Sequence, residues 1–385
     1  MSEKIKIVHV LEGFAGGAAT YINNTLVRLS DRGFDVTFIC SLGRAEDGSE
    51  ERIEELKRHG VKVHVVDMRR EIKPLSDIRA FLAILKIFRK NRFDILHSHC
   101  SKAGALGRVA AAITGIKVRI HSPHCFAFVR CGGVLSKRIY IVLEKMLGAI
   151  TTKLVLVGKA EKEVAERYKI VSADRCELVQ NGLEIKTVKF SDAEKSAYKK
   201  QLGIDSNCRV VAAVCRLTEY KGVEKFIEAA ELCKTEDAVF VIAGDGQLRR
   251  QIEKTITKKG LSKKILLLGH LRDMDRLYSI CDVAVLCSLA EGQSYVILEA
   301  MRSRCAIVAS SVIGNIELLD EARGVLVENR PEHIAVGIDS ILVDEQNRQQ
   351  MRDIAYEYFL KDHNVERQVD KLSIIYKSAV RDRKL

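Results

Sequence analysis

The 385-residue chain has no tryptophan, and aromatic residues make up only 6% of it. Proteins that bind single-stranded nucleic acid stack bases on aromatic side chains, and no motif of such aromatics is visible in this sequence. Nucleic-acid binding is therefore suggested only by the net charge of +12, and we do not expect it. That charge equally favours phosphorylated substrates or an acidic membrane surface.

Long hydrophobic runs are also missing, since no stretch approaches the roughly 20 apolar residues that span a bilayer. The apolar run near the N-terminus is too short for a signal peptide. The eleven cysteines lack the paired short spacings of a zinc site, and many lie in apolar, strand-like segments. These features predict a cytoplasmic protein with reduced thiols.

Short β-branched segments alternate with amphipathic segments along the chain, which predicts an α/β fold with parallel sheets covered by helices on both faces. Because the chain is too long for one hydrophobic core, we expect two Rossmann-like domains facing a cleft between them. The expected domains are 1–185, joined by a crossing helix at about 363–385, and 186–362. The expected strands are 4–11, 35–41, 61–67, 93–99, 118–122, 152–157, 209–215, 238–244, 264–269, 282–288, 306–310 and 324–327.

Two segments combine apolar and basic residues at helical spacing. Segment 79–93 has Leu85 and Phe88 on an apolar stripe with arginines and lysines around it, and segment 133–147 is similar. Such helices suit either the cover of a sheet or contact with anionic lipid. For 79–93 we favour the sheet cover, because every sheet-covering helix needs an apolar stripe. The second segment keeps membrane contact open.

The segment EGQSYVILEAM contains two carboxylates, Glu291 and Glu299, on either side of a turn and a helix start. Residues eight apart on one helix lie roughly 12 Å apart along its axis, too far to share a proton or a metal but suited to two ends of a long ligand. Between them, Gln293, Ser294 and Tyr295 would offer backbone N–H groups to a phosphate. The pattern favours a sugar nucleotide, although a helix-capping Glu299 and a solvated Glu291 are an equally simple interpretation of these residues alone.

The segment SLAEGQSYVILEAM, followed by CAIVASSVIGNIELL and GVLV, closely resembles the donor-binding core of the retaining glycosyltransferases of family GT4, which have the GT-B fold. The resemblance covers nearly the whole chain and is closest to enzymes that build bacterial polysaccharides or polyprenol-linked oligosaccharides. It implies transfer of a hexose or N-acetylhexosamine from a nucleotide-diphosphate sugar, with UDP preferred, to a saccharide or polyprenol-linked acceptor. It also implies that Glu291 contacts the sugar and Glu299 the ribose, and that no metal or other cofactor is needed.

Arg216 and Lys221 lie in the turn after an expected strand, in VCRLTEYKG. Two fixed cations there would bind a diphosphate and stabilise the charge that grows on it as the glycosidic bond breaks. The family has a similar Arg and Lys pair against the leaving group. The resemblance therefore makes both residues catalytic as well as donor-binding.

Further donor contacts follow the next two expected strands. Gly244 and Gly246 lie at a strand-to-helix turn that the family places near the nucleotide, although a lone pair of glycines is weak evidence. Asp273 and Asp275 have a spacing that holds a divalent ion in other transferases, but we interpret them as the cap and first turn of a helix. The resemblance places the base against the backbone of His270, Leu271 and Arg272.

In the first domain, Gly16 and Gly17 open a helix after the first strand and would let the backbone approach the diphosphate or the acceptor. Their spacing departs from a dinucleotide fingerprint, and no acid is placed to bind a ribose after the second strand, so NAD binding is not expected.

Histidines follow the fourth and fifth expected strands, in HSHCSKAGALGR and HSPHCFAF. No acid or cysteine spacing completes a metal site with them. By the resemblance, His124 is the expected active-site histidine and His121 its close competitor, while His99 and Lys102 are further acceptor-side candidates. A purely structural role for the histidine also stays open.

Some positions depart from the family pattern: Arg304 and Ile313 stand where glycine is usual, and Ala306 where proline is usual. The role of the loop near Gly314 is therefore less certain. Two alternatives to a transferase stay open, which are a sugar-nucleotide epimerase or hydrolase on the same fold and a nucleic-acid-binding protein.

Overall fold

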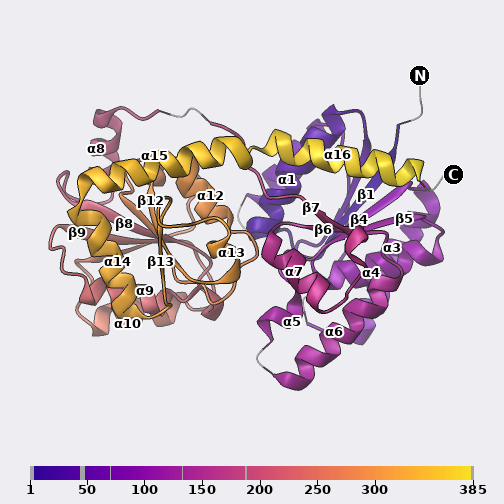
Figure 1. Cartoon of the computed structure of the whole chain (residues 1–385), viewed down its shortest axis with the longest axis horizontal. Coiled ribbons are helices and arrows are strands. Elements are labelled where there is room, and N and C mark those ends of the chain that lie inside the picture. The colour runs from indigo at the N-terminus through magenta and orange to yellow at the C-terminus, as the bar shows by residue number, and fades with distance from the viewer. Residues whose placement is uncertain (1–3, 44–47, 70, 132, 187–188, 383–385) are drawn as a thin grey trace. The chain divides into compact units, whose positions relative to one another are not determined.

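The computed structural model describes residues 4–43, 48–69, 71–131, 133–186 and 189–382. The chain divides into two compact units (Figure 1). Unit 1 comprises Met1–Glu184 together with Val365–Leu385, and unit 2 comprises Ile185–Asn364. Each unit contains one parallel β-sheet.

The sheet of unit 1 has seven strands in the order β3-β2-β1-β4-β5-β6-β7. Its inner strands are buried on both faces, which explains their nearly continuous apolar sequences. The strands are β1 (Lys6–Leu11), β2 (Asp35–Cys40), β3 (Lys62–Val65), β4 (Ile95–His99), β5 (Val118–Ser122), β6 (Lys153–Leu156) and β7 (Cys176–Leu178).

Helices connect these strands, and the C-terminal helix α16 returns to this unit. Arg28 and Arg32 of α1 bind Glu366 of α16 at 2.7 and 2.6 Å, and Gln368 accepts a hydrogen bond from the backbone N–H of Gly182. The helices are α1 (Gly16–Asp31), α2 (Ser49–Arg58), α3 (Pro74–Asn91), α4 (Ser101–Ile113), α5 (Ala127–Arg130), α6 (Val134–Ala149), α7 (Lys159–Arg167), the 3₁₀ turn η1 (Ala173–Arg175) and α16 (Val365–Arg381).

The sheet of unit 2 has six strands in the order β10-β9-β8-β11-β12-β13. These are β8 (Arg209–Val214), β9 (Ala238–Ala243), β10 (Ile265–Gly269), β11 (Val283–Leu286), β12 (Ala306–Ser310) and β13 (Val325–Val327). The helices are α8 (Asp192–Gln201), η2 (Glu219–Lys221), α9 (Val223–Leu232), α10 (Arg249–Lys258), α11 (Met274–Ser279), α12 (Tyr295–Arg302), α13 (Ile313–Ile316), α14 (Pro331–Val343) and α15 (Glu345–Asp362).

The predicted α/β class with two Rossmann-like sheets is confirmed. Helix α3 buries Ile84, Leu85 and Phe88 in the core of unit 1, so it covers the sheet, as we predicted for segment 79–93. All eleven cysteines are free thiols. Within the described part of the chain, no helix is long and apolar enough to cross a membrane.

Candidate functional site

Each sheet has a point where the strand order reverses, between β1 and β4 in unit 1 and between β8 and β11 in unit 2. In open parallel sheets, ligands bind outside the carboxyl ends of the strands at such a point. Most of the predicted residues lie at or just after the carboxyl ends of these strands and of their neighbours, so the topology brings most of each set to one edge of its sheet.

In unit 2, Lys221 ends the short turn η2 after β8, and Glu291 follows β11. The Lys221 ammonium donates to the Glu291 carboxylate at 2.5 Å, and both side chains are mostly buried. Gly222 holds Lys221 close to β11, because its backbone is left-handed (φ 62°) and a Cβ there would come within 2.1 Å of the Cys287 carbonyl oxygen. The structure thus joins two predicted site residues that are 70 positions apart.

The turn between Glu291 and helix α12 contains the predicted phosphate-binding backbone. Ser294 is the N-cap of α12 without a side-chain cap, and Gln293, Ser294 and Tyr295 are buried. Gly314 packs against this turn so closely that a Cβ would lie 1.6 Å from the Gly292 carbonyl oxygen. Although the neighbouring Ile313 departs from the family pattern, the glycine that this close packing requires, Gly314, is present.

Glu299 lies in the second turn of α12 and not in the first, so the interpretation as a helix-capping acid is wrong. Its carboxylate accepts a hydrogen bond from the Tyr278 hydroxyl at 3.1 Å. Burial raises the pKa of Glu299 above its usual value, against the opposing charge of Arg302. Glu299 therefore lies deeper in the unit than an ordinary surface acid.

The remaining donor-side predictions lie at the ends of β9 and β10. Gly244 and Gly246 have positive φ, and Cβ atoms there would meet the carbonyl oxygens of Cys215 and Leu217 at 1.9 and 2.5 Å. The β9 turn thus contacts the segment that contains Arg216, which is itself exposed. His270, Leu271 and Arg272 follow β10 and are exposed or partly exposed.

The interpretation of Asp273 and Asp275 as helix residues is confirmed. Asp273 is the N-cap of α11 and accepts a hydrogen bond from the Arg276 N–H at 3.2 Å. Asp275 lies in the first turn, where it binds Arg302 at 2.5 Å and Lys186 at 3.1 Å. Both acids thus have protein partners.

In unit 1, Gly16 and Gly17 are the first residues of α1, and Gly16 has a positive φ of 59°. Lys102, in the first turn of α4, donates to Asp77 at 2.6 Å and to the Glu71 carbonyl oxygen at 2.5 Å. This side chain therefore ties α4 to the beginning of α3.

His99 and His124 form a hydrogen-bonded pair at the carboxyl end of β4, with 3.0 Å between His99 Nδ1 and His124 Nε2. The Tyr21 ring packs edge-on against His124, with 4.8 Å between the ring centroids. Burial lowers the pKa of His124 to about 4, and burial together with His97 lowers that of His99 well below its usual value. Both rings are therefore neutral at pH 7.

His121 lies on the other face of the sheet. In the register, His121 pairs with Ser98, whereas His99 pairs with Ser122, so the two histidines point to opposite faces. His121 is fully buried against α4, where a Cβ on Gly104 would meet its ring at 2.4 Å. His124 bonds to His99, so the two competing candidates, His121 and His124, lie in separate environments.

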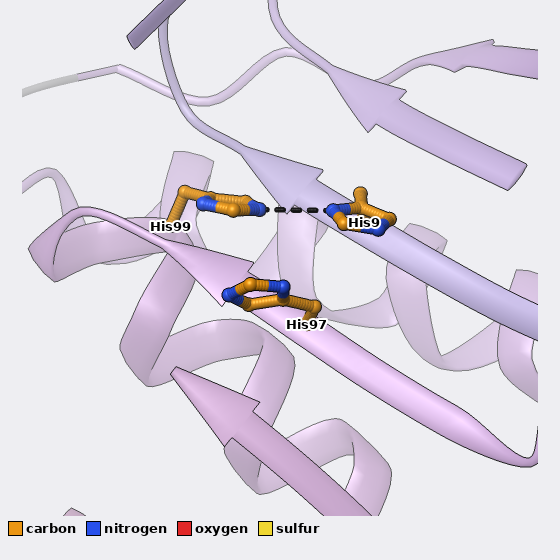
Figure 2. A group of neighbouring side chains, drawn as sticks. All are labelled: His9, His97 and His99. Atoms are coloured by element: carbon orange, nitrogen blue, oxygen red, sulfur yellow. Dashed lines mark hydrogen bonds between the residues drawn. The ribbon is translucent and has the colours of Figure 1, made fainter. Parts of the chain in front are cut away.

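His9 of β1 was not singled out from the sequence, yet it lies beside His97 and His99 (Figure 2). The signal was a polar residue inside the apolar strand KIVHVL. One nitrogen from each of His9, His97 and His99 lies within 4.8 Å of the others, which is a candidate metal set. However, His97 already bonds Tyr376 at 2.5 Å and Ser122 at 2.9 Å, so ligation would break existing hydrogen bonds.

Comparisons with known proteins identify the family of the chain. Residues 15–187 match the family described as Glycosyltransferase Family 4, and residues 194–358 match glycosyl transferases group 1. The chain is 29% identical over 97% of both chains to the UDP-Gal:alpha-D-GlcNAc-diphosphoundecaprenol alpha-1,3-galactosyltransferase of Escherichia coli.

Solved structures share the fold. HepE of Anabaena, in complex with UDP and glucose, aligns with a TM-score of 0.83 at 20% identity, covering 97% of this chain and 100% of its own. The sucrose-phosphate synthase of Thermosynechococcus elongatus aligns with a TM-score of 0.82 at 18% identity, covering 97% and 99%.

Proposed function

Since the chain belongs to glycosyltransferase family 4 and has the GT-B fold, we propose that it transfers a hexose or N-acetylhexosamine, with retention, from a UDP-sugar to a saccharide or polyprenol-linked acceptor. The UDP donor and the lipid-linked acceptor are supported by the activity for which the E. coli relative is named. Its substrates, UDP-galactose and GlcNAc-diphosphoundecaprenol, are the first pair to test.

The proposal depends most on the contact between Lys221 and Glu291 beside the start of α12. A carboxylate that binds sugar hydroxyls, a cation and the positive N-terminal end of a helix together suit the sugar and the diphosphate of one donor. Glu299, eight residues further, is the proposed ribose contact.

In the proposed reaction, the acceptor hydroxyl attacks the anomeric carbon on the face from which the diphosphate departs. The bond between the anomeric carbon and the diphosphate oxygen breaks, the new glycosidic bond forms, and a phosphate oxygen takes the hydroxyl proton. Arg216 and Lys221 stabilise the charge on the leaving group. Glu291 orients the sugar, and His124 is the proposed active-site histidine.

The proposed transfer is tested by adding UDP-galactose, UDP-N-acetylglucosamine and UDP-glucose in a thermal-shift assay and then following the products by NMR. A bound donor raises the melting temperature, and an α-linked product from an α-linked donor is expected. Release of nucleotide without acceptor would instead identify a hydrolase or epimerase, and an inverted product would refute the mechanism. The Glu291→Gln variant should lose the shift, whereas Glu328→Gln, which alters an exposed acid of the same unit, should keep it.

A polyprenol-linked acceptor requires contact with a membrane, and helix α6 is the proposed contact surface. Its solvent-facing stripe is apolar, with side chains that are 45% to 73% exposed. Arg138 and Lys145 are exposed on the same helix. Apolar side chains between cations are typical of a helix that lies on anionic lipid. The stripe comprises Leu135, Ile139, Val142, Leu143 and Met146.

An open pocket of about 460 Å³ lies beside the C-terminal end of α6. Lys145, Lys169 and Arg175 line it together with Glu166, so its balance is positive. This surplus of cations suits a phosphate headgroup. We place the enzyme in the reducing cytoplasm, in keeping with its free thiols, and at the inner face of the membrane.

Sedimentation with vesicles tests this placement. The chain should bind phosphatidylglycerol vesicles more strongly than phosphatidylcholine vesicles, and a Leu143→Ser, Met146→Ser variant should bind less. Ile374→Ser, which removes an exposed apolar side chain of α16, is the matched control. Equal sedimentation of all three proteins, or none with either lipid, would remove α6 from the proposal.

A further inference from the structure

Three histidines of unit 1 form a row that ends at the proposed active-site residue. His9 Nδ1 lies 3.0 Å from His99 Nε2, and His99 Nδ1 lies 3.0 Å from His124 Nε2. Figure 2 shows the first of these bonds, in which a nitrogen of the His9 ring on β1 points toward a nitrogen of the His99 ring on β4. His9 and His99 are fully buried, so bulk water does not compete for the hydrogen bond between them.

A neutral imidazole has one donor nitrogen and one acceptor nitrogen, so the row can have only two directions. In one direction each ring donates through Nδ1 toward His124, and in the other each ring donates through Nε2 toward His9. The two directions differ at His9 Nε2, which carries a proton only in the second direction. This nitrogen is buried and has no hydrogen-bond partner among the described residues. Buried N–H groups without an acceptor are rarer than buried acceptors without a donor. The first direction is therefore favoured.

His97 has a fixed tautomer of its own and does not interrupt the row. The Ser122 hydroxyl donates to the Val155 carbonyl oxygen, so it accepts the proton of His97 Nε2. His97 Nδ1 is then the acceptor of the Tyr376 hydroxyl at 2.5 Å. Both nitrogens of His97 are thus committed, which favours hydrogen bonding over metal binding in this cluster.

We propose that His9 and His99 are positioning residues that hold His124 as the tautomer with its proton on Nδ1, so that His124 donates a hydrogen bond to an oxygen of the bound sugar or acceptor. This inference rests on the proposed function. It adds that His124 is a hydrogen-bond donor and not a general base, which agrees with a proton transfer from the acceptor to a phosphate oxygen.

The tautomers are measured directly by NMR on the full chain labelled with ¹⁵N-histidine, without any substrate. We expect His124 to carry its proton on Nδ1, and to become a mixture of tautomers in a His9→Leu variant. A wild-type His124 with its proton on Nε2 would overturn the proposal. Because no turnover is involved, this result is independent of whether the proposed transferase activity is correct.

Kinetics then test the positioning role with two replacements of the same side chain. His9→Asn keeps an N–H donor at the place of Nδ1, whereas His9→Leu fills similar space without one. We expect kcat to fall about 10-fold in His9→Leu with KM nearly unchanged, and to recover to within about 3-fold of wild type in His9→Asn. Equal activity of the two variants would contradict the role of the hydrogen bond.

Zinc addition separates this role from a metal site. If one equivalent of Zn²⁺ shifts the ring signals of His9, His97 and His99 together and raises the melting temperature, the cluster is a metal site and the proposal fails. No shift at one equivalent supports the hydrogen-bonded row.

Discussion

Acid should destabilise this protein through His9, and the effect can be isolated by one substitution. Burial lowers the pKa of His9 to about 3, from 6.5 for the exposed side chain. Its neighbouring rings are those of His97, His99 and Tyr376. Between these two pKa values the unfolded chain binds a proton that the folded chain does not bind, so the stability of the folded state falls as the pH falls.

The size of the effect follows from the two values. The stabilising contribution of neutral His9 is fully present above pH 6.5 and is lost at about 1.4 kcal/mol per pH unit below it, down to about pH 3. Between pH 7.5 and pH 5, the free energy of unfolding should therefore fall by about 2 kcal/mol more in the wild type than in His9→Asn.

Urea unfolding at pH 7.5, 6.5, 6 and 5 measures this difference. Val8→Ala is the matched control, since Val8 is buried in the same strand and its loss should lower stability by about 1 to 3 kcal/mol at every pH, with a curve parallel to the wild type. If the curve of His9→Asn is also parallel to the wild type, the inference that His9 is buried as a neutral ring is refuted.

Unit 2 gives three further expectations. Arg216→Ala or Lys221→Ala should lower kcat by about 100-fold or more, while KM for the donor changes little. Stopped assays with saturating UDP-sugar measure kcat, and an unchanged kcat would show that the assignment is wrong. Glu299→Gln should weaken donor binding by about 10-fold to 100-fold in calorimetry, because a hydrogen bond from a ribose hydroxyl to a charged acceptor is lost. Gly314→Ala should displace the Gly292 backbone and lower both the melting temperature and donor affinity, and an unchanged affinity would show that the turn does not bind the donor.

Most strands could be predicted because parallel strands buried on both faces have apolar sequences. The exceptions have physical causes. Strand β7 (Cys176–Leu178) was missed because it is too short to show a pattern. Helix α8 (Asp192–Gln201) was missed because it is charged and largely exposed, and its only sequence signal is the capping box at Ser191. The alternating strands and helices were sufficient for the fold class, which needs only their order.

The sequence indicated the residue types of the candidate site but not the contacts between them. Lys221 and Glu291 meet because β8 lies beside β11, and this strand order is a property of the whole sheet. Similarly, His99 and His121 look equivalent as strand-end histidines, and only the pairing register sends them to opposite faces. His9 was missed because a single polar residue in a strand is not a motif, although burial makes it part of the row.

The two units offer different chemistry at their strand ends, and the proposed reaction needs that difference. Unit 2 supplies charge, through Lys221 and Glu291, at the proposed site of the diphosphate. Unit 1 supplies histidines such as His124, whose low pKa keeps them neutral at pH 7. A protonated imidazole could give its proton to the departing phosphate and so compete with the acceptor hydroxyl, whereas a neutral donor cannot. The neutral histidines therefore agree with the proposed reaction, in which the departing phosphate takes its proton from the attacking acceptor hydroxyl.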